Sequence, residues 1–246
     1  MGDPRGAAPW RVAATQVLVD DLGSPELAAD DLHHLSRVLR LRAGEVVCAT
    51  DGRGGWQLTT FTGSAALEPT GEQGVQPAPS PRLTVGFALV KGERPELVVQ
   101  KLTELGVDHI VPFTARRSVV RWDESKAAKQ FERLRRVARE ACAQSRRLHV
   151  PVVGGVGDEP DRLASLAQLR SAGAVLADAG GRALRRDDRM VLIGPEGGWD
   201  PDESDGADRV AVGDNVLRAE TAAIAVGVAL TALRVGLVGE GLGSSP

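Results

Sequence analysis

The sequence has few cysteines, few aromatic side chains and no long apolar run. Its 246 residues include two cysteines, four tryptophans, four phenylalanines and no tyrosine. Cys48 and Cys142 fit no metal-binding spacing, so we expect two reduced thiols and no metal. No apolar stretch approaches the roughly 20 residues that span a bilayer, and residues 1–10 lack the apolar core of a secretion signal. These absences predict a cytoplasmic protein without a membrane partner.

Two common nucleotide-binding motifs are also absent. No Gly-x-x-x-x-Gly-Lys-Ser/Thr segment is present, which argues against a P-loop. No Gly-x-Gly-x-x-Gly follows a predicted strand in the second half, which argues against a standard dinucleotide site. His33 and His34 are adjacent, and neighbours on a helix point about 100° apart, so they make a poor metal pair. No Ser, Cys and His grouping suggests a hydrolase triad, although residues distant in sequence can also form one.

Positive charge is concentrated in one part of the chain. The formal net charge is -3, yet residues 116–147 hold eleven lysines or arginines against four aspartates or glutamates. Because the protein as a whole is acidic, this concentration of positive charge needs a local structural or functional explanation.

The first part of the chain has the pattern of a small β-rich unit. We expect strands over residues 11–19, 46–50 and 56–61, with a glycine-rich turn between the last two, and a helix over residues 26–41. Residues 70–81 are rich in proline and glycine without an apolar period, so we expect a linker there.

From residue 82 onward, predicted strands and helices alternate. The expected strands are 83–90, 109–113, 174–177, 190–194 and 210–212, and the expected helices are 93–105, 125–147 and 217–237. This alternation predicts an α/β fold with a mostly parallel sheet covered on both faces.

The last predicted helix carries no charge between Glu220 and Arg234. A helix that is apolar all round must be covered all round. One face can pack on its own sheet, and we expect the other to pack on a second subunit, which predicts a homodimer. The alternative is a helix that is fully internal to one chain.

Two segments near the C-terminus pass from an apolar run through a charged loop into a helix. Residues 192–198 read Leu-Ile-Gly-Pro-Glu-Gly-Gly, and residues 216–223 read Val-Leu-Arg-Ala-Glu-Thr-Ala-Ala. Side by side at the carboxyl edge of a parallel sheet, they would form a ligand site. Gly194, Gly197 and Gly198 of the first segment let backbone approach a flat ligand, and the absence of phosphate motifs favours an adenine-bearing ligand such as S-adenosylmethionine. Taken alone, the Gly-Pro-Glu-Gly-Gly segment is better interpreted as an ordinary surface turn.

Taken together, the two segments closely resemble the SPOUT methyltransferases, specifically the bacterial 16S rRNA uridine N3-methyltransferase family. Further resemblances follow in the same order along the chain: residues 34–42 with Gly44, Lys91-Gly92, residues 103–107, residues 117–119 and residues 144–147. The match covers nearly the whole chain.

The resemblance implies a PUA-like RNA-binding β-barrel over residues 1–73 and a SPOUT α/β domain with a trefoil knot over residues 74–246. It also implies a homodimer that binds S-adenosyl-L-methionine in the knot loops and produces N3-methyluridine in small-subunit rRNA. The family often carries an acidic or histidine-containing loop after the strand at 174–177, where this chain reads Asp178-Ala179-Gly180-Gly181. We expect a cofactor loop there without an assigned side-chain role. The expected cofactor-binding residues are Ala177, Asp178, Ile193, Gly194, Pro195, Glu196, Gly197, Gly198, Val212, Gly213, Val216, Leu217, Arg218, Thr221 and Ala222.

Three residues of the two segments are candidates for catalysis. Uracil N3 carries a proton at neutral pH, so the site must favour its anion. Arg218 is the candidate for stabilising negative charge on the uracil oxygens, and Glu196 or Glu220 for accepting the proton. Alternatively, Glu220 only complements the helix dipole, and Arg218 only forms a salt bridge to Glu196 or Glu220.

The basic residues are candidates for binding RNA phosphate, and scarce aromatics argue against an extensive stacking platform. A solvated helix face is the alternative for those on the long helix. Two other functions stay open, namely a SPOUT enzyme with a different RNA target and a non-catalytic RNA-binding homologue. The RNA candidates are Arg37, Arg40, Lys91, Arg116, Arg117, Arg121, Arg146 and Arg147, with Arg133 and Arg136 on the long helix.

Overall fold

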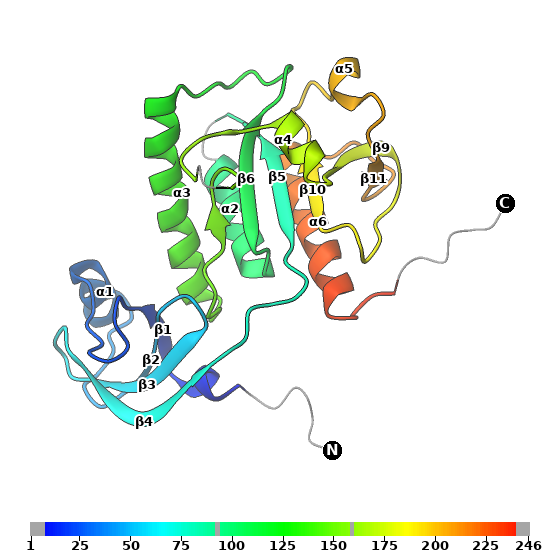
Figure 1. Ribbon diagram of the computed structural model, residues 1–246. Coiled ribbons are helices and arrows are strands. Elements are labelled where there is room, and N and C mark those ends of the chain that lie inside the picture. The colour runs from blue at the N-terminus through cyan, green and yellow to red at the C-terminus, as the bar shows by residue number, and fades with distance from the viewer. Residues whose placement is uncertain (1–7, 92–93, 158–159, 240–246) are drawn as a thin grey trace. The chain divides into compact units, whose positions relative to one another are not determined.

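The computed structural model describes residues 8–91, 94–157 and 160–239 (Figure 1). The chain divides into two compact units. Unit 1 comprises residues up to Ala78 together with Arg139–Val150, and unit 2 comprises Pro79–Ala138 and the residues from Pro151 onward.

Unit 1 is built on a four-stranded mixed sheet in the order β1-β2-β3-β4. Its strands are β1 (Thr15–Leu18), β2 (Val46–Thr50), β3 (Gly55–Phe61) and β4 (Leu67–Val75). The first two strands pair in parallel and the others pair antiparallel. Before the sheet lies a short 3₁₀ turn, η1 (Pro9–Val12), and between β1 and β2 lies α1 (Ala29–His33), which continues into a π-helical turn, η2 (His34–Val38).

The turn between β2 and β3 follows from a single side chain. Asp51 Oδ1 accepts hydrogen bonds from the backbone N–H groups of Arg53, at 2.7 Å, and Gly55, at 3.0 Å. Asp and Asn favour turns because their short side chains bond to nearby backbone in this way. Both flanking strands were predicted, and they pair in antiparallel register.

Three predictions for unit 1 need correction. The strand expected over 11–19 begins only at Thr15, because residues 9–12 form η1. The helix expected over 26–41 is confined to residues 29–38. The linker expected over 70–81 is wrong for its first part, because β4 continues to Val75. Most of β4 is exposed, so it lacks the alternating apolar pattern by which a strand is recognised.

Residues that follow the long helix Glu124–Gln144 complete the core of unit 1. Leu148 is fully buried and packs with Cys48, Trp56 and Leu58. Gln16 Nε2 donates a hydrogen bond to the carbonyl oxygen of Arg147 at 2.7 Å. The chain therefore returns to unit 1 after it has formed part of unit 2.

Unit 2 is an α/β fold with a parallel sheet in the order β11-β9-β10-β5-β6-β7, and β8 also pairs with β6. The strands are β5 (Thr84–Ala88), β6 (His109–Thr114), β7 (Val152–Val153), β8 (Ala164–Ser165), β9 (Val175–Ala183), β10 (Met190–Ile193) and β11 (Arg209–Ala211). The helices are α2 (Arg94–Leu105), α3 (Glu124–Gln144), α4 (Leu166–Ser171), α5 (Pro201–Ser204) and α6 (Ala219–Arg234). The predicted parallel α/β architecture of this part of the chain is confirmed.

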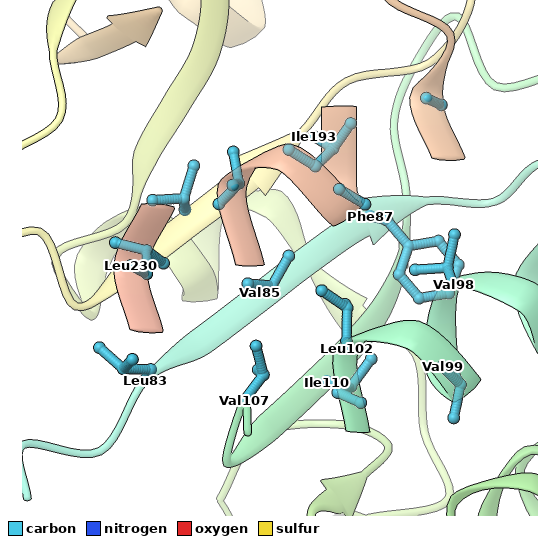
Figure 2. Close-up of a cluster of buried hydrophobic side chains, with 14 of the residues drawn as sticks. Leu83, Val85, Phe87, Val98, Val99, Leu102, Val107, Ile110, Ile193 and Leu230 are labelled. Atoms are coloured by element: carbon cyan, nitrogen blue, oxygen red, sulfur yellow. The ribbon is translucent and has the colours of Figure 1, made fainter. Parts of the chain in front are cut away.

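Alternate residues of the central strands face two different apolar clusters. On one face, Val85, Phe87 and Ile110 pack with residues of α2 and α6 (Figure 2), and α3 adds Leu134 and Ala138 to the same cluster. On the other face, Val111 and Leu192 pack with residues of α4 and with Trp199. Both faces of the sheet are therefore covered, as the strand and helix alternation predicts.

Helix α6 lies close against α2. A Cβ atom on Gly227 would come within 2.7 Å of Leu102 Cδ2, so any larger residue would force Leu102 or the helix to shift. The helix buries Val226 and Leu230 but leaves Val228 48% exposed, so it is not fully internal to this chain.

Several boundaries in unit 2 differ from the predictions. The predicted start of α2 at Glu93 lies outside the described residues. Helix α3 ends at Gln144, three residues early, because Arg146 takes a left-handed backbone conformation with φ of 57°. Strand β9 continues to Ala183, so the loop expected at 178–181 is part of a strand. Short α4, α5, β7 and β8 were not predicted.

Candidate functional site

A cleft of about 550 Å³ opens where β10 and β11 end, beside residues 177–179 in the middle of β9 and the start of α6. β9 lies between β10 and β11 in the sheet, and the segments 192–198 and 216–223, which follow β10 and β11, both line this cleft. Every expected cofactor-binding residue lines the cleft except Gly197 and Thr221. Those that line it are Ala177, Asp178, Ile193, Gly194, Pro195, Glu196, Gly198, Val212, Gly213, Val216, Leu217, Arg218 and Ala222.

One side of the cleft is shaped by Trp199. Its ring stacks on that of Phe113, with centroids 6.1 Å apart and planes 4° from parallel. Gly194 lies directly beneath the indole, since a Cβ atom there would come within 2.9 Å of Trp199 Cε2. The turn closes with a hydrogen bond of 2.8 Å from Gly198 N–H to the carbonyl oxygen of Pro195. The conformation of the Gly-Pro-Glu-Gly-Gly segment is therefore fixed by packing.

The glycines also leave backbone open to a ligand. A Cβ atom on Gly198 or Gly213 would meet no atom within 4 Å, and both residues line the cleft. Apolar side chains of Ile193 and Leu217 flank this open backbone. Exposed peptide groups between aliphatic walls suit the edge and faces of an adenine ring.

Seven lining residues were missed by the sequence analysis. Trp199 directly follows the Gly-Pro-Glu-Gly-Gly turn, and this place in the sequence could have indicated that it lines the site. Arg209 was not identifiable, because it reaches the site from the start of β11 and pairs with Asp178 at 2.9 Å. The missed residues are Ala179, Trp199, Ser204, Arg209, Val210, Asn215 and Ala219.

The three candidate catalytic residues differ in their surroundings. Arg218 is exposed, lines the cleft and makes no ion pair with any residue that the structure describes. Glu196 and Glu220 both pair with Arg94 at the start of α2. The alternative in which Arg218 forms a salt bridge to either glutamate is therefore wrong. Of the two carboxylates, only Glu196 lines the cleft.

The arginines after β6 are engaged by the acidic segment that follows Trp199. Arg116 pairs with Asp202 and, at 3.3 Å, with Asp200. Arg117 Nε lies 3.5 Å from Asp200 Oδ2, and its Nη1 donates to the carbonyl oxygen of Gly197 at 3.2 Å. Arg121 Nη2 reaches the carbonyl oxygen of Arg116 at 3.4 Å. These candidates for RNA binding thus also brace the cleft loop.

The remaining candidates for RNA binding are dispersed. Arg37 and Arg40 are exposed on unit 1, and Lys91 is exposed on unit 2. The Arg146 guanidinium donates hydrogen bonds to the carbonyl oxygens of Ala13 at 2.6 Å and Ala14 at 2.9 Å, so it stabilises the fold of unit 1. Arg147 is half-buried and accepts the bond from Gln16 through its carbonyl. Gly92, beside Lys91, lies outside the described residues.

Both cysteines are buried, free thiols in unit 1. Burial raises the pKa of Cys48 to about 12 and that of Cys142 to about 11, despite the opposing effect of nearby arginines. Within the described ranges, no three His, Cys, Asp or Glu side chains gather as metal ligands. No described helix has the length and apolarity to cross a membrane.

Comparison with known proteins identifies similar chains across both units. Residues 76–231 match the model of an RNA methyltransferase domain, and residues 27–63 match that of an RNA methyltransferase PUA domain. Ribosomal RNA small subunit methyltransferase E of Mycobacterium bovis is 34% identical over 217 residues, which cover 79% of this chain and 80% of that protein. The protein of the same name from Synechocystis sp. is 33% identical over 220 residues, covering 80% of this chain and 69% of its own.

Solved structures resemble most of the chain, across both units. The crystal structure of a ribosomal RNA small subunit methyltransferase E from Neisseria gonorrhoeae bound to S-adenosyl methionine has a TM-score of 0.72 and 25% identity. That match covers 89% of this chain and 97% of the other. A putative methyltransferase from Legionella pneumophila in complex with the bound cofactor has a TM-score of 0.74 and 26% identity, with the same coverage.

Proposed function

The chain belongs to the ribosomal RNA small subunit methyltransferase E family, and we propose that it methylates N3 of a specific uridine in 16S ribosomal RNA. It is an S-adenosylmethionine-dependent RNA methyltransferase. The observation that carries the proposal is the cleft, in which open glycine backbone, apolar walls and an unpaired arginine meet at the carboxyl edge of the sheet.

The lining residues fit the cofactor. Gly194, Gly198 and Gly213 would present backbone to the adenine ring, with Ile193 and Leu217 beside it. Asp178 lines the cleft from within β9 and, with Arg209, would hydrogen-bond the polar parts of the ligand. When bound, S-adenosylmethionine supplies an electrophilic methyl group on a sulfonium.

Residues of the chain would prepare the uridine for attack. Arg218 would stabilise the negative charge that develops on O2 or O4 as N3 loses its proton. Glu196, which lines the cleft, would accept that proton directly or through a water molecule. Holding the base beside the methyl group would supply a further part of the rate.

The proposal extends to the two parts of the chain. Residues 1–73, together with the end of β4 and Arg139–Val150 of the same unit, would form a PUA-like RNA-binding barrel, supported by the PUA family match and by exposed Arg37 and Arg40. The rest of residues 74–246 would form a SPOUT domain with a trefoil knot in its backbone. Phosphate contacts would come from Arg37, Arg40, Lys91, Arg116, Arg117 and Arg121, with Arg147 as a further candidate.

We further propose a homodimer acting in the cytoplasm, where the ribosomal RNA substrate is found. The charge-free helix α6 supports the dimer, because it leaves Val228 48% exposed. The same fold with a different RNA target, and a homologue that binds RNA without catalysis, are the alternatives.

The deciding experiment measures methyl transfer from labelled S-adenosylmethionine to small-subunit particles, naked 16S rRNA and transfer RNA, with the modified base mapped. We expect N3-methyluridine at one position in the small-subunit substrate. Methylation confined to transfer RNA would establish the different target. Absence of cofactor binding by calorimetry would instead establish the non-catalytic homologue.

A further inference from the structure

A cluster of three charged side chains joins separate segments of unit 2 beside the cleft. Arg94 is the first residue of α2, Glu196 lies in the loop after β10, and Glu220 lies in the first turn of α6. Arg94 Nη1 pairs with Glu196 Oε1, and Arg94 Nε lies 3.8 Å from Glu220 Oε1. The Arg94 guanidinium therefore links both glutamates that the sequence analysis gives as candidates for accepting the proton.

The two glutamates occupy different environments. The Glu220 side chain is 14% exposed, does not line the cleft, and its buried Oε2 has no hydrogen-bond partner among the described residues. The Glu196 side chain is 51% exposed and does line the cleft. Only Glu196 can therefore meet a ligand in the cleft, whereas Glu220 faces Arg94.

Within this cluster, Glu220 anchors Arg94, and Arg94 holds Glu196. Glu220 is held by burial at the start of a packed helix, so it offers a fixed anchor for the Arg94 guanidinium. Arg94 in turn holds one oxygen of Glu196, and no described residue donates to the other. A proton acceptor works best when its carboxylate is held in one orientation within hydrogen-bond reach of the donor.

We infer that Arg94 is a positioning residue for methyl transfer, anchored by Glu220 and holding Glu196 toward the substrate. The inference rests on the proposed function and deepens it, because it assigns the proton-accepting role to Glu196 and a supporting role to Glu220. The Arg94–Glu196 pair is exposed and contributes little to folding stability. Because Glu220 is largely buried, Arg94→Lys, which keeps a positive charge beside it, is the variant that least disturbs folding.

The first test is a double-mutant cycle on single-turnover methyl transfer with Arg94→Gln and Glu196→Gln. Loss of a positioned proton acceptor costs about 10²-fold or more in rate. We expect each variant to lose rate on that scale and the double variant to be no slower than Glu196→Gln alone. Arg94→Lys should recover part of the rate. Independent, multiplying losses would overturn the inference, because Arg94 would then act without Glu196.

The second test needs neither cofactor nor RNA. Amide hydrogen exchange at Gly198, whose N–H bonds to the Pro195 carbonyl oxygen, should accelerate in both Arg94→Gln and Glu220→Gln, and no further in the double variant. Lys101→Gln is the matched control, because Lys101 pairs with Glu104 at 2.9 Å on the same helix away from the cleft. Unchanged exchange in Arg94→Gln would overturn the inference.

Cofactor affinity separates positioning from a general structural role. Calorimetry should give the same dissociation constant for S-adenosylmethionine in wild type and Arg94→Gln, within about threefold, since a positioning residue acts after binding. Loss of binding in both Arg94→Gln and Arg94→Lys would make Arg94 part of the cofactor site and overturn the inference. A wild-type protein that transfers no methyl group would contradict the proposed function, while the exchange measurement would still decide the role of Arg94.

Discussion

The indole Nε1 of Trp199 lies 2.9 Å from the carbonyl oxygen of Ala177 and donates a hydrogen bond to it. The bond joins the loop after β10 to β9, so two walls of the cleft are fixed to each other. Since Trp199 also stacks on Phe113, the shape of this side is set by the apolar core. We expect the cleft to be preformed before a ligand enters, which lowers the entropic cost of binding.

Replacing Arg218 tests its role in stabilising the uracil anion. Arg218→Ala should lower single-turnover methyl transfer by about 10²- to 10³-fold, the typical cost of losing one charge-stabilising group. Cofactor affinity measured by calorimetry should persist. Arg189→Ala, which removes another exposed arginine of unit 2, is the control and should leave the rate unchanged. Unchanged turnover in Arg218→Ala would rule out the role.

The acidic segment after Trp199 should compete with RNA for Arg116. Asp202 is 71% exposed and Arg116 58% exposed, so their pair is weak and open to exchange with a phosphate. Asp202→Asn should tighten binding of a small-subunit rRNA fragment by several-fold, as measured by fluorescence anisotropy. Asp205→Asn changes the net charge equally at an exposed residue and is the control. Equal tightening in both variants would show that only overall charge matters.

Binding to RNA should weaken steeply with salt, because phosphate contacts release counterions. Arg37→Ala and Arg40→Ala should each reduce the slope of log affinity against log salt by about 1. Arg53→Ala, exposed in the turn between β2 and β3, should not. A slope near zero for wild type would contradict phosphate recognition.

The exposed side of α6 should form the dimer interface. Val228→Glu places a charge on that side and should convert the protein to a monomer in sedimentation velocity at micromolar concentration. Val75→Glu is the control, since Val75 is 77% exposed on β4 of unit 1. A wild-type protein that already sediments as a monomer would exclude the interface.

Asp188 should make folding stability depend on pH in acid. Burial opposes its ionisation, but hydrogen bonds from the Arg182 guanidinium and the Arg185 N–H outweigh burial and lower the pKa of Asp188. In an unfolded chain the pKa of an aspartate is about 3.9. The ionised carboxylate thus stabilises the fold above that pH, and the contribution is lost as pH falls through the folded pKa.

Asp188→Asn should therefore unfold at lower urea concentration at pH 7 and show a flatter loss of stability below about pH 4. Asp187→Asn alters the exposed neighbour and should leave the urea midpoint close to that of wild type. A midpoint for Asp188→Asn equal to that of wild type at pH 7 would contradict the prediction.

The family resemblance stated from the sequence is confirmed by the match over residues 76–231 and by the relatives. The cleft could be predicted because local patterns place two charged loops, residues 194–198 and 213–218, after apolar strands of one parallel sheet. Strand β4 could not be predicted, because an exposed edge strand lacks the alternation of apolar and polar residues that marks a strand. Arg94 could not either, because it pairs with Glu196 from 102 residues away, a relationship that only the folded chain creates.

The return of Arg139–Val150 to unit 1 limits how the protein can be divided. Leu148 fills the core beside Trp56, and Arg146 caps the carbonyl oxygens of Ala13 and Ala14. A gene fragment ending at residue 78 would encode a polypeptide with a vacant core position and two carbonyls lacking their donor. Unit 1 is therefore not a transplantable module, and exchanging it between proteins requires grafting two stretches of sequence together.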